Sequence, residues 1–130
     1  MPRKSKYPIV WEVILLDKLE KDLNQLKAPL EVREELRDKI EELRNFGPLA
    51  KRPNFGTLRH AKIKNMKEII LTADGGGWRA IYRFDPKRKG IILVVGNKAG
   101  MYEGSKKLEK WYDTLMTEAE RRYQYYLKTQ

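Results

Sequence analysis

The sequence has no cysteine, a single histidine and no long apolar run. The absence of cysteine excludes a disulfide framework and any thiolate metal site, and it is typical of a reducing compartment. The apolar stretch from Ile9 to Leu16 contains Glu12 and is followed at once by charged residues, so it has the features of neither an export signal nor a membrane span. We therefore expect a cytoplasmic protein without a membrane segment.

Acidic residues are scarce in one part of the chain only. The formal net charge is +10, and residues 51–110 carry 15 Lys and Arg against 5 Asp and Glu, whereas the remainder carries 13 of each. The whole excess of positive charge therefore comes from the central segment. This distribution favours a localised basic surface that binds a polyanion, and it leaves open whether that polyanion is a nucleic acid, a membrane surface or an acidic protein.

The first third of the chain predicts a strand and two helices. Residues 9–15 read as a strand, and Asp17 followed by Glu20 resembles a capping box at the start of a helix that ends near Lys27. Pro29 fits the first turn of a second helix, which Gly47 and Pro48 end. The apolar residues that share the inner face of this second helix are Val32, Leu36, Ile40 and Leu43.

The remainder predicts a three-strand meander and a last helix. The strands are expected at 68–72, 78–84 and 90–95, where the unbroken run at 91–95 should be the most buried. Ser105 is expected to cap the last helix, whose inner side would carry Leu108, Trp111, Leu115, Ala119 and Tyr123 or Tyr126. At 130 residues the chain fits a single domain, residues 1–130, of the α+β class.

The strand at 78–84 raises the functional question. Trp78 and Tyr82 cannot share a face with Arg79 and Arg83, because side chains alternate along a strand. We expect helices on one face of the antiparallel sheet and an open opposite face that presents the arginines. The simplest interpretation is a solvated strand face.

The run GGGWRAIYRFDPKRKGIILVVGNKAG at 75–100, followed by WYDTLMTEAERRYQYYL at 111–127, resembles the phage-derived Gp49-like, or HigB-type, branch of the RelE/ParE toxin superfamily. The shared elements are the glycine-rich turn before an aromatic residue and Arg, the Phe-Asp-Pro turn and the Gly-x-Lys-x-Gly run. The resemblance implies a RelE-like fold: an N-terminal strand and helix hairpin packed on an antiparallel sheet with a three-strand meander, and a C-terminal helix.

It also implies a function. Such proteins are toxins of type II toxin–antitoxin systems, endoribonucleases that cut mRNA, commonly on the ribosome, and that a cognate antitoxin inhibits within a hetero-oligomer. They use neither metal nor cofactor: the ribose 2′-hydroxyl attacks the adjacent phosphate. By position, Arg79 would neutralise the phosphate, Lys98 would stabilise charge or donate a proton, and Tyr102 would transfer a proton or stack on a base.

A second set of residues is expected to bind RNA without reading its sequence: Lys62, Lys64, Lys67, Arg83 and His60. Solvated surface positions are an equally simple interpretation of each. Two departures from the family pattern concern the site. Relatives often have an arginine in the first strand of the meander, whereas the stretch at 67–70 reads Lys-Glu-Ile-Ile, and Ala99 follows Lys98 where many have a second lysine.

Two other functions fit the same features. One is a non-catalytic member of the superfamily, either a ParE-like poison of DNA gyrase or an RNA-binding module; the other is a structural interaction domain. The last helix also has more aromatic residues than one inner face can bury, so its surplus tyrosines are expected at an antitoxin or self-association surface.

Overall fold

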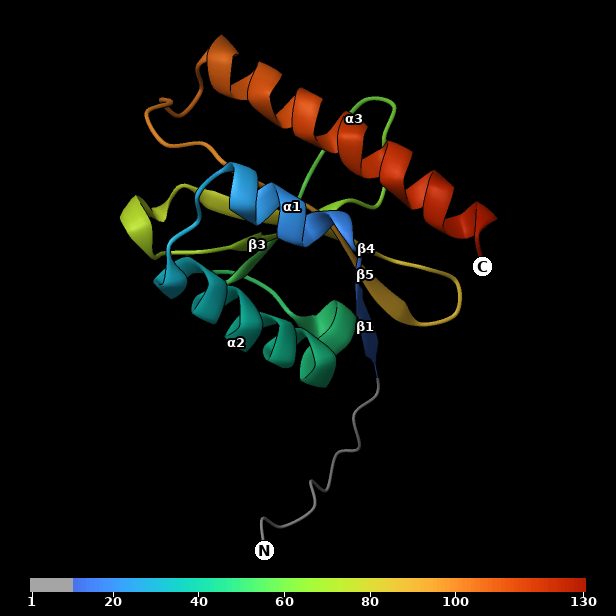
Figure 1. Cartoon of the computed structure of the whole chain (residues 1–130). Helices are drawn as coiled ribbons and strands as arrows, with labels where there is room; N and C mark the ends of the chain where they lie inside the picture. The colour runs from blue at the N-terminus through green and yellow to red at the C-terminus, as the bar shows by residue number, and fades with distance from the viewer. Residues whose placement is uncertain (1–10) are drawn as a thin grey trace, which may run out of the picture.

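The computed structural model describes residues 11–130. Their order is one strand, two helices, four further strands and a long C-terminal helix, with two short 3-10 turns between them. Figure 1 shows the sheet between α3 on one side and α2 on the other. The elements are β1 Glu12–Leu15, α1 Lys18–Gln25, α2 Leu30–Phe46, η1 Gly47–Leu49, β2 Phe55–Thr57, β3 Lys67–Ile70, η2 Asp74–Gly76, β4 Trp78–Phe84, β5 Lys89–Asn97 and α3 Lys106–Lys128.

The five strands form one sheet in the order β1-β5-β4-β3-β2. Strands β3, β4 and β5 are antiparallel neighbours, which confirms the predicted meander. β2 adds an antiparallel edge that the sequence did not predict, and β1 lies parallel to β5 at the opposite edge, so the sheet is mixed. The predicted first strand is confirmed from Glu12 onward, and its start at 9–10 lies outside the described residues.

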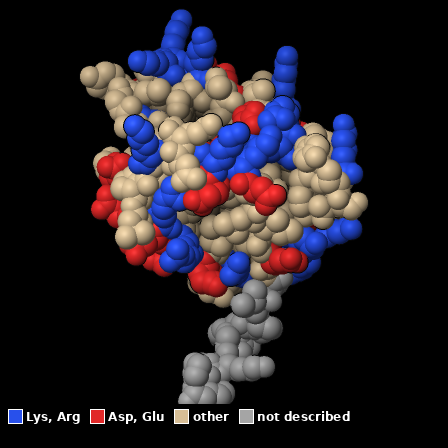
Figure 2. All heavy atoms as spheres, in the orientation of Figure 1, with Lys and Arg blue, Asp and Glu red and all other residues tan. Residues whose placement is uncertain are grey.

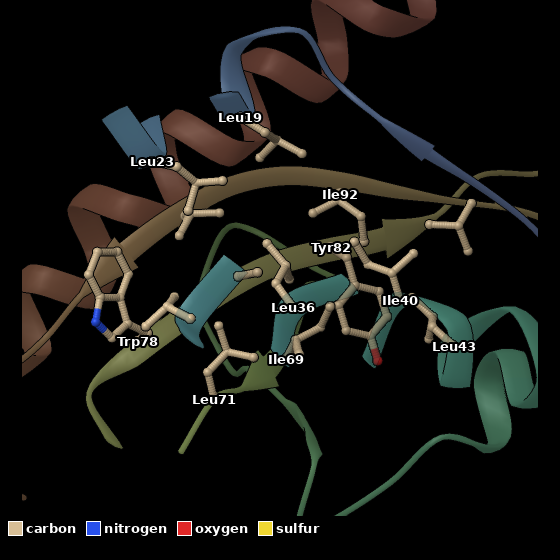
Figure 3. Packing of buried hydrophobic residues seen from close by; sticks show 14 of the residues in the cluster. Leu19, Leu23, Leu36, Ile40, Leu43, Ile69, Leu71, Trp78, Tyr82 and Ile92 are labelled. Atoms are coloured by element: carbon tan, nitrogen blue, oxygen red, sulfur yellow. The ribbon is translucent and has the colours of Figure 1, made fainter. Parts of the chain in front are cut away.

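The first hydrophobic core lies between the sheet and the helix hairpin. The four predicted positions of α2 are all buried there, together with Leu19 and Leu23 of α1. Figure 3 shows these side chains meeting Ile69, Trp78, Tyr82 and Ile92 of the sheet. This packing confirms the predicted helix hairpin and the aromatic face of β4.

A second core lies on the opposite face, under α3. Ile81, Ile91 and Leu93 pack there against Met116 and Tyr123. The predicted open face is therefore wrong, because α3 crosses back over it instead of joining the hairpin. The inner side of α3 consists of Leu108, Met116, Ala119, Tyr123 and Tyr126, while Trp111 and Leu115 are only half-buried.

Local capping explains where the helices begin. Ser105 Oγ accepts a hydrogen bond of 3.1 Å from Leu108 N, so the predicted cap of α3 is confirmed. Asp17, by contrast, makes no side-chain cap and has helical dihedral angles, so the predicted capping box of α1 is wrong. Within residues 11–130, no helix combines the length and the apolar character needed to cross a membrane.

One ion-pair network joins α1, β5 and α3. Arg122 of α3 forms a two-pronged contact with Asp22 of α1 at 2.8 and 2.9 Å and donates to Leu93 O at 2.9 Å. Asp22 also accepts a hydrogen bond from Val95 N. The network thus links α1 and α3, which belong to different helix layers, to β5 of the sheet.

Candidate functional site

Arg79 lies at the start of β4, on the face that α3 covers. Its Nη1 donates to the carbonyl oxygens of Gly76 at 2.9 Å and Trp78 at 2.8 Å, and its Nε lies 3.5 Å from Glu68 Oε1. The side chain is 8% exposed, so it is not the solvated strand arginine of the simplest interpretation. Backbone carbonyls fix the guanidinium, and Glu68 is its one carboxylate partner among the described residues.

Glu68 of β3 connects Arg79 to the last helix. It is 5% exposed and accepts a hydrogen bond of 2.8 Å from the Tyr112 hydroxyl. Burial raises the pKa of Tyr112, the charge of Glu68 and the hydrogen bond to it raise it further, and Arg79 opposes the increase. Three elements, β3, β4 and α3, thus bring together a carboxylate, a phenol and a guanidinium: Tyr112 is hydrogen-bonded to Glu68, and Glu68 forms an ion pair with Arg79.

Lys98 approaches the same tyrosine from the end of β5. Its Nζ lies 5.7 Å from the centroid of the Tyr112 ring and pairs with Glu103 at 3.1 Å. Its backbone N donates to Gly77 O at 2.9 Å, which ties the end of β5 to the turn before Arg79. We call Glu68, Arg79, Lys98 and Tyr112 the reactive cluster.

The three glycines at 75–77 determine the position of this turn. Gly75 and Gly76 have φ of 86° and 79°, which favour glycine. A Cβ on Gly77 would lie 2.7 Å from Asn97 Oδ1 and 2.9 Å from Ala99 N, so a larger residue would push the end of β5 away. The triple glycine therefore brings Arg79 and Lys98 together.

Helix α2 anchors the segment before the glycines. Glu35 accepts hydrogen bonds from Thr72 N at 2.9 Å and Ala73 N at 2.8 Å, and it pairs with Lys39 at 3.0 Å. Burial by itself would raise the pKa of Glu35, but these hydrogen bonds outweigh it and lower the pKa to about 2. The carboxylate is thus ionised at all physiological pH values.

Two of the three predicted catalytic residues converge and one does not. Arg79 and Lys98 both border Tyr112. Tyr102 is 82% exposed, and no side-chain hydrogen bond or ring contact within residues 11–130 joins it to the cluster. Tyr112, ten positions along the chain, supplies the phenol at this place instead.

The predicted RNA-binding residues lie in two places, at the loop at 60–64 and at the edge formed by β2 and β3. Arg83 contacts α3: its Cζ lies 4.1 Å from the centroid of the Tyr123 ring, and its Nη1 lies 3.4 Å from Glu120 Oε1. Lys62 and Lys64 are exposed, whereas the half-buried Lys67 donates to Thr57 Oγ1 beside the sheet edge. Arg83 Nη1 also donates to Lys64 O at 3.3 Å, and Lys64 Nζ donates to His60 O at 3.2 Å, so the structure brings Arg83 to the loop at 60–64 and leaves Lys67 apart from it.

His60 is held by its own loop. Its Nδ1 accepts hydrogen bonds from Lys62 N at 3.0 Å and Ile63 N at 3.1 Å, and its Nε2 lies 3.4 Å from Asp113 of α3. Acceptance at Nδ1 places the proton of the neutral ring on Nε2. His60 therefore ties the loop to α3 beside Tyr112.

Sequence reasoning missed Glu68 and Tyr112. The family pattern shows only that the stretch at 67–70 lacks an arginine, and no local feature of the sequence links Glu68 of β3 to Arg79 of β4. No local pattern singles out Tyr112, because its partner is 44 positions away. In residues 11–130 no group of three or more His, Cys, Asp and Glu side chains is arranged to hold a metal ion.

Comparisons with known proteins agree with the architecture. The family model of phage-derived Gp49-like proteins matches residues 21–124. HigB2 of Mycobacterium tuberculosis, a candidate toxin by its name, is 39% identical over 75 residues, which are 57% of this chain and 34% of that protein. HigB3 of the same organism, named in the same way, is 32% identical over 91 residues, 70% of this chain and 73% of that one.

A solved structure shows the same fold. A copper-bound mutant toxin from Helicobacter pylori matches with a TM-score of 0.51 and 21% identity, over 70% of this chain and 98% of that one. The matched region spans about a third of HigB2 and most of HigB3. Because the family model covers most of the sequence, including β3, β4, β5 and Tyr112, the resemblance expected from the glycine-rich and Phe-Asp-Pro motifs is confirmed: the chain belongs to the family of phage-derived Gp49-like proteins.

Proposed function

We propose that this protein is the toxin of a type II toxin–antitoxin system and acts as an endoribonuclease that cuts mRNA in the cytoplasm and so inhibits translation. The observation that carries the proposal is the reactive cluster, in which two cations and a phenol–carboxylate pair from four elements meet. The candidate-toxin names of the two relatives support the same class.

The cluster has the groups that RNA cleavage requires. The ribose 2′-oxygen attacks phosphorus, the bond from phosphorus to the 5′-oxygen breaks, and one proton must leave the nucleophile while another reaches the leaving oxygen. Tyr112 accepts the 2′-proton as its own proton passes to Glu68, along their 2.8 Å hydrogen bond. The products are a 2′,3′-cyclic phosphate and a 5′-hydroxyl end.

The two cations serve the phosphate. Arg79 neutralises the charge that develops on the phosphorane oxygens, where its buried position strengthens the electrostatic interaction. Lys98, whose side chain is largely buried beside the Tyr112 ring, protonates the leaving 5′-oxygen. Every step in this scheme uses side chains that the fold brings together.

The test is primer extension on a reporter transcript, with and without ribosomes. Wild type should produce discrete new 5′ ends, whereas Arg79→Ala and Tyr112→Phe should lower their yield by about 100-fold or more, the usual effect of losing acid–base or electrostatic catalysis. Tyr125→Phe is the matched control, because Tyr125 is a 68% exposed tyrosine of the same helix. Ends that appear only with ribosomes would show that cleavage takes place on the ribosome.

Failure has a defined meaning. If folded wild-type protein yields no new ends under either condition, the nuclease proposal is wrong, and the alternative of a gyrase poison or RNA-binding module takes its place. If Tyr112→Phe cuts as wild type does, the nuclease stands but the assignment of its proton carrier falls.

We also propose an antitoxin as protein partner, docked beside β1 and the end of α3. A groove there of about 460 Å³ is lined by Leu15, Tyr125 and Arg121, and Leu15 and Tyr125 remain exposed although both are large and apolar in part. Exposed aromatics of this kind are enriched at interfaces. Co-purification of the product of the neighbouring gene with wild type, but not with Leu15→Glu, would support this placement.

A further inference from the structure

A second basic site lies at the β2 edge of the sheet. A pocket of about 410 Å³ is bordered there by four cations, Lys51, Arg52, Arg59 and Lys67, and the part of the chain that the structure describes contributes no carboxylate to its lining. Within residues 11–130 none of these four forms an ion pair, unlike Arg79, Arg83 and Lys98. Unpaired cations around one hollow favour an anion as the occupant.

Tyr82 adds a further hydrogen-bond donor to the lining of this pocket. Its ring is 1% exposed and lies edge-on to Phe55 and Phe84, at centroid distances of 6.2 and 5.8 Å. Its hydroxyl, at the far end of the ring from β4 in Figure 3, makes no hydrogen bond with any described residue. Burial and then the charge of Glu68 raise its pKa, so the phenol keeps its proton to donate.

The pocket adjoins the reactive cluster. A Cβ on Gly56, the central residue of β2, would lie 3.3 Å from both Arg52 Nη2 and Glu68 Oε2. A cation of the pocket and the carboxylate of the cluster therefore border the same space above Gly56, which a larger side chain would fill. A ligand that occupies both places must be long and carry negative charge at intervals, as a nucleic-acid strand does.

We propose that this pocket holds a backbone phosphate of the same single-stranded RNA whose neighbouring phosphate is cut at the reactive cluster. That the ligand is RNA rests on the proposed function. The pocket supplies affinity and position but does not read bases, because its donors are suited to phosphate oxygens. The four cations of the pocket belong to the basic segment at 51–110, so this segment would bind RNA at the pocket as well as at the cluster.

The experiment measures binding apart from cleavage. A fluorescent 2′-O-methyl RNA oligomer, which lacks the nucleophile, is titrated with wild type and with Lys51→Gln/Arg59→Gln at several salt concentrations. We expect the double variant to bind roughly tenfold more weakly and the slope of log affinity against log salt to fall by about 0.7 for each phosphate that it no longer neutralises. Lys21→Gln/Arg37→Gln removes two exposed cations from α1 and α2 and is the matched control, expected to change neither.

Two further variants separate this inference from the proposed function. Tyr112→Phe should keep wild-type affinity for the oligomer while losing cleavage of an unmodified transcript. Tyr82→Phe keeps the buried ring, so a loss of affinity with an unchanged far-ultraviolet circular dichroism spectrum and a cooperative thermal transition would support the role of its hydroxyl, and wild-type affinity would exclude that role.

The outcomes are distinct. If wild type cuts transcripts and the pocket double variant binds the oligomer as tightly as the control does, the pocket inference is wrong and the nuclease remains. If wild type never cuts but the pocket double variant still loses affinity, the nuclease is wrong and the pocket remains an RNA site. If the pocket double variant no longer bound an acidic protein partner but bound the RNA oligomer as tightly as wild type does, the inference would be wrong and the pocket would be a protein-binding site.

Discussion

The proton of Tyr112 is held more firmly than that of an exposed tyrosine. Because its pKa is raised, the native state keeps this proton above pH 10 or so, where the unfolded chain releases it, and stability must fall as pH rises there. Tyr112→Phe should therefore reduce the alkaline slope of the unfolding free energy by up to about 1.4 kcal/mol per pH unit. Urea denaturation at a series of alkaline pH values measures it, with Tyr102→Phe as the exposed control. Equal slopes in all three proteins would contradict the hydrogen-bonded burial of Tyr112.

Residues that occur in local motifs were predictable, and their distant partners were not. Arg79 and Lys98 lie in motifs that can be read from a few neighbouring residues, and the structure brings both to one tyrosine. Glu68 and Tyr112 become partners only through the path of α3 over the sheet, which no local pattern encodes. Tyr102 lies close to Lys98 in sequence, which favours it as the phenol of the site, yet its side chain is exposed.

At the scale of elements, one acidic side chain of α2 fixes the approach to β4. The pKa of Glu35 is about 2 against an ordinary value of 4.5, so its contribution to stability is fully present above pH 4.5 or so and is lost as pH falls toward 2. Glu35→Gln should lower the unfolding free energy at neutral pH by about 2 kcal/mol and flatten its decline in acid. Thermal unfolding from neutral to acidic pH measures this, and Glu34→Gln, at an exposed neighbour, should leave the curve unchanged. A steep acid decline that survives in Glu35→Gln would show that another group is responsible.

Elements with strong periodicity were predictable, and weak or nonlocal ones were not. The residues of α2 repeat at helical spacing, and β5 is an unbroken apolar run, so both were found. β2 has three residues and no alternation to detect, and it exists because it pairs with β3. The parallel placement of β1 and the side chosen by α3 depend on tertiary contacts, among them Asp22 with Arg122.

Over the whole molecule, the sheet is stable only between two helix layers. Figure 2 shows basic side chains gathered where α3 lies and acidic ones where α2 lies, so the two layers also differ in charge. A chain that ends at Gly104 would uncover five buried side chains, Met66, Ile81, Ile91, Leu93 and Val94. At about 1.5–3 kcal/mol each, their exposure equals most of the stability of a typical domain.

We therefore expect the shortened chain to lose cooperative thermal unfolding, as measured by calorimetry. A chain that ends at Lys128 keeps all of α3 and should unfold like the full protein. A sharp transition in the chain that ends at Gly104 would mean that the first core is sufficient alone.

Because β1 pairs with β5, the sheet cannot close early in the synthesis of the chain. Glu12 finds its partner only at Lys89, and the proposed proton carrier of the cluster comes later still, at Tyr112. A ribosome must therefore make the chain at least to Lys89 before β1 can pair with β5, and at least to Tyr112 before the cluster can assemble. Under the proposed function, a nascent chain shorter than this lacks the cluster and is harmless to the ribosome that builds it.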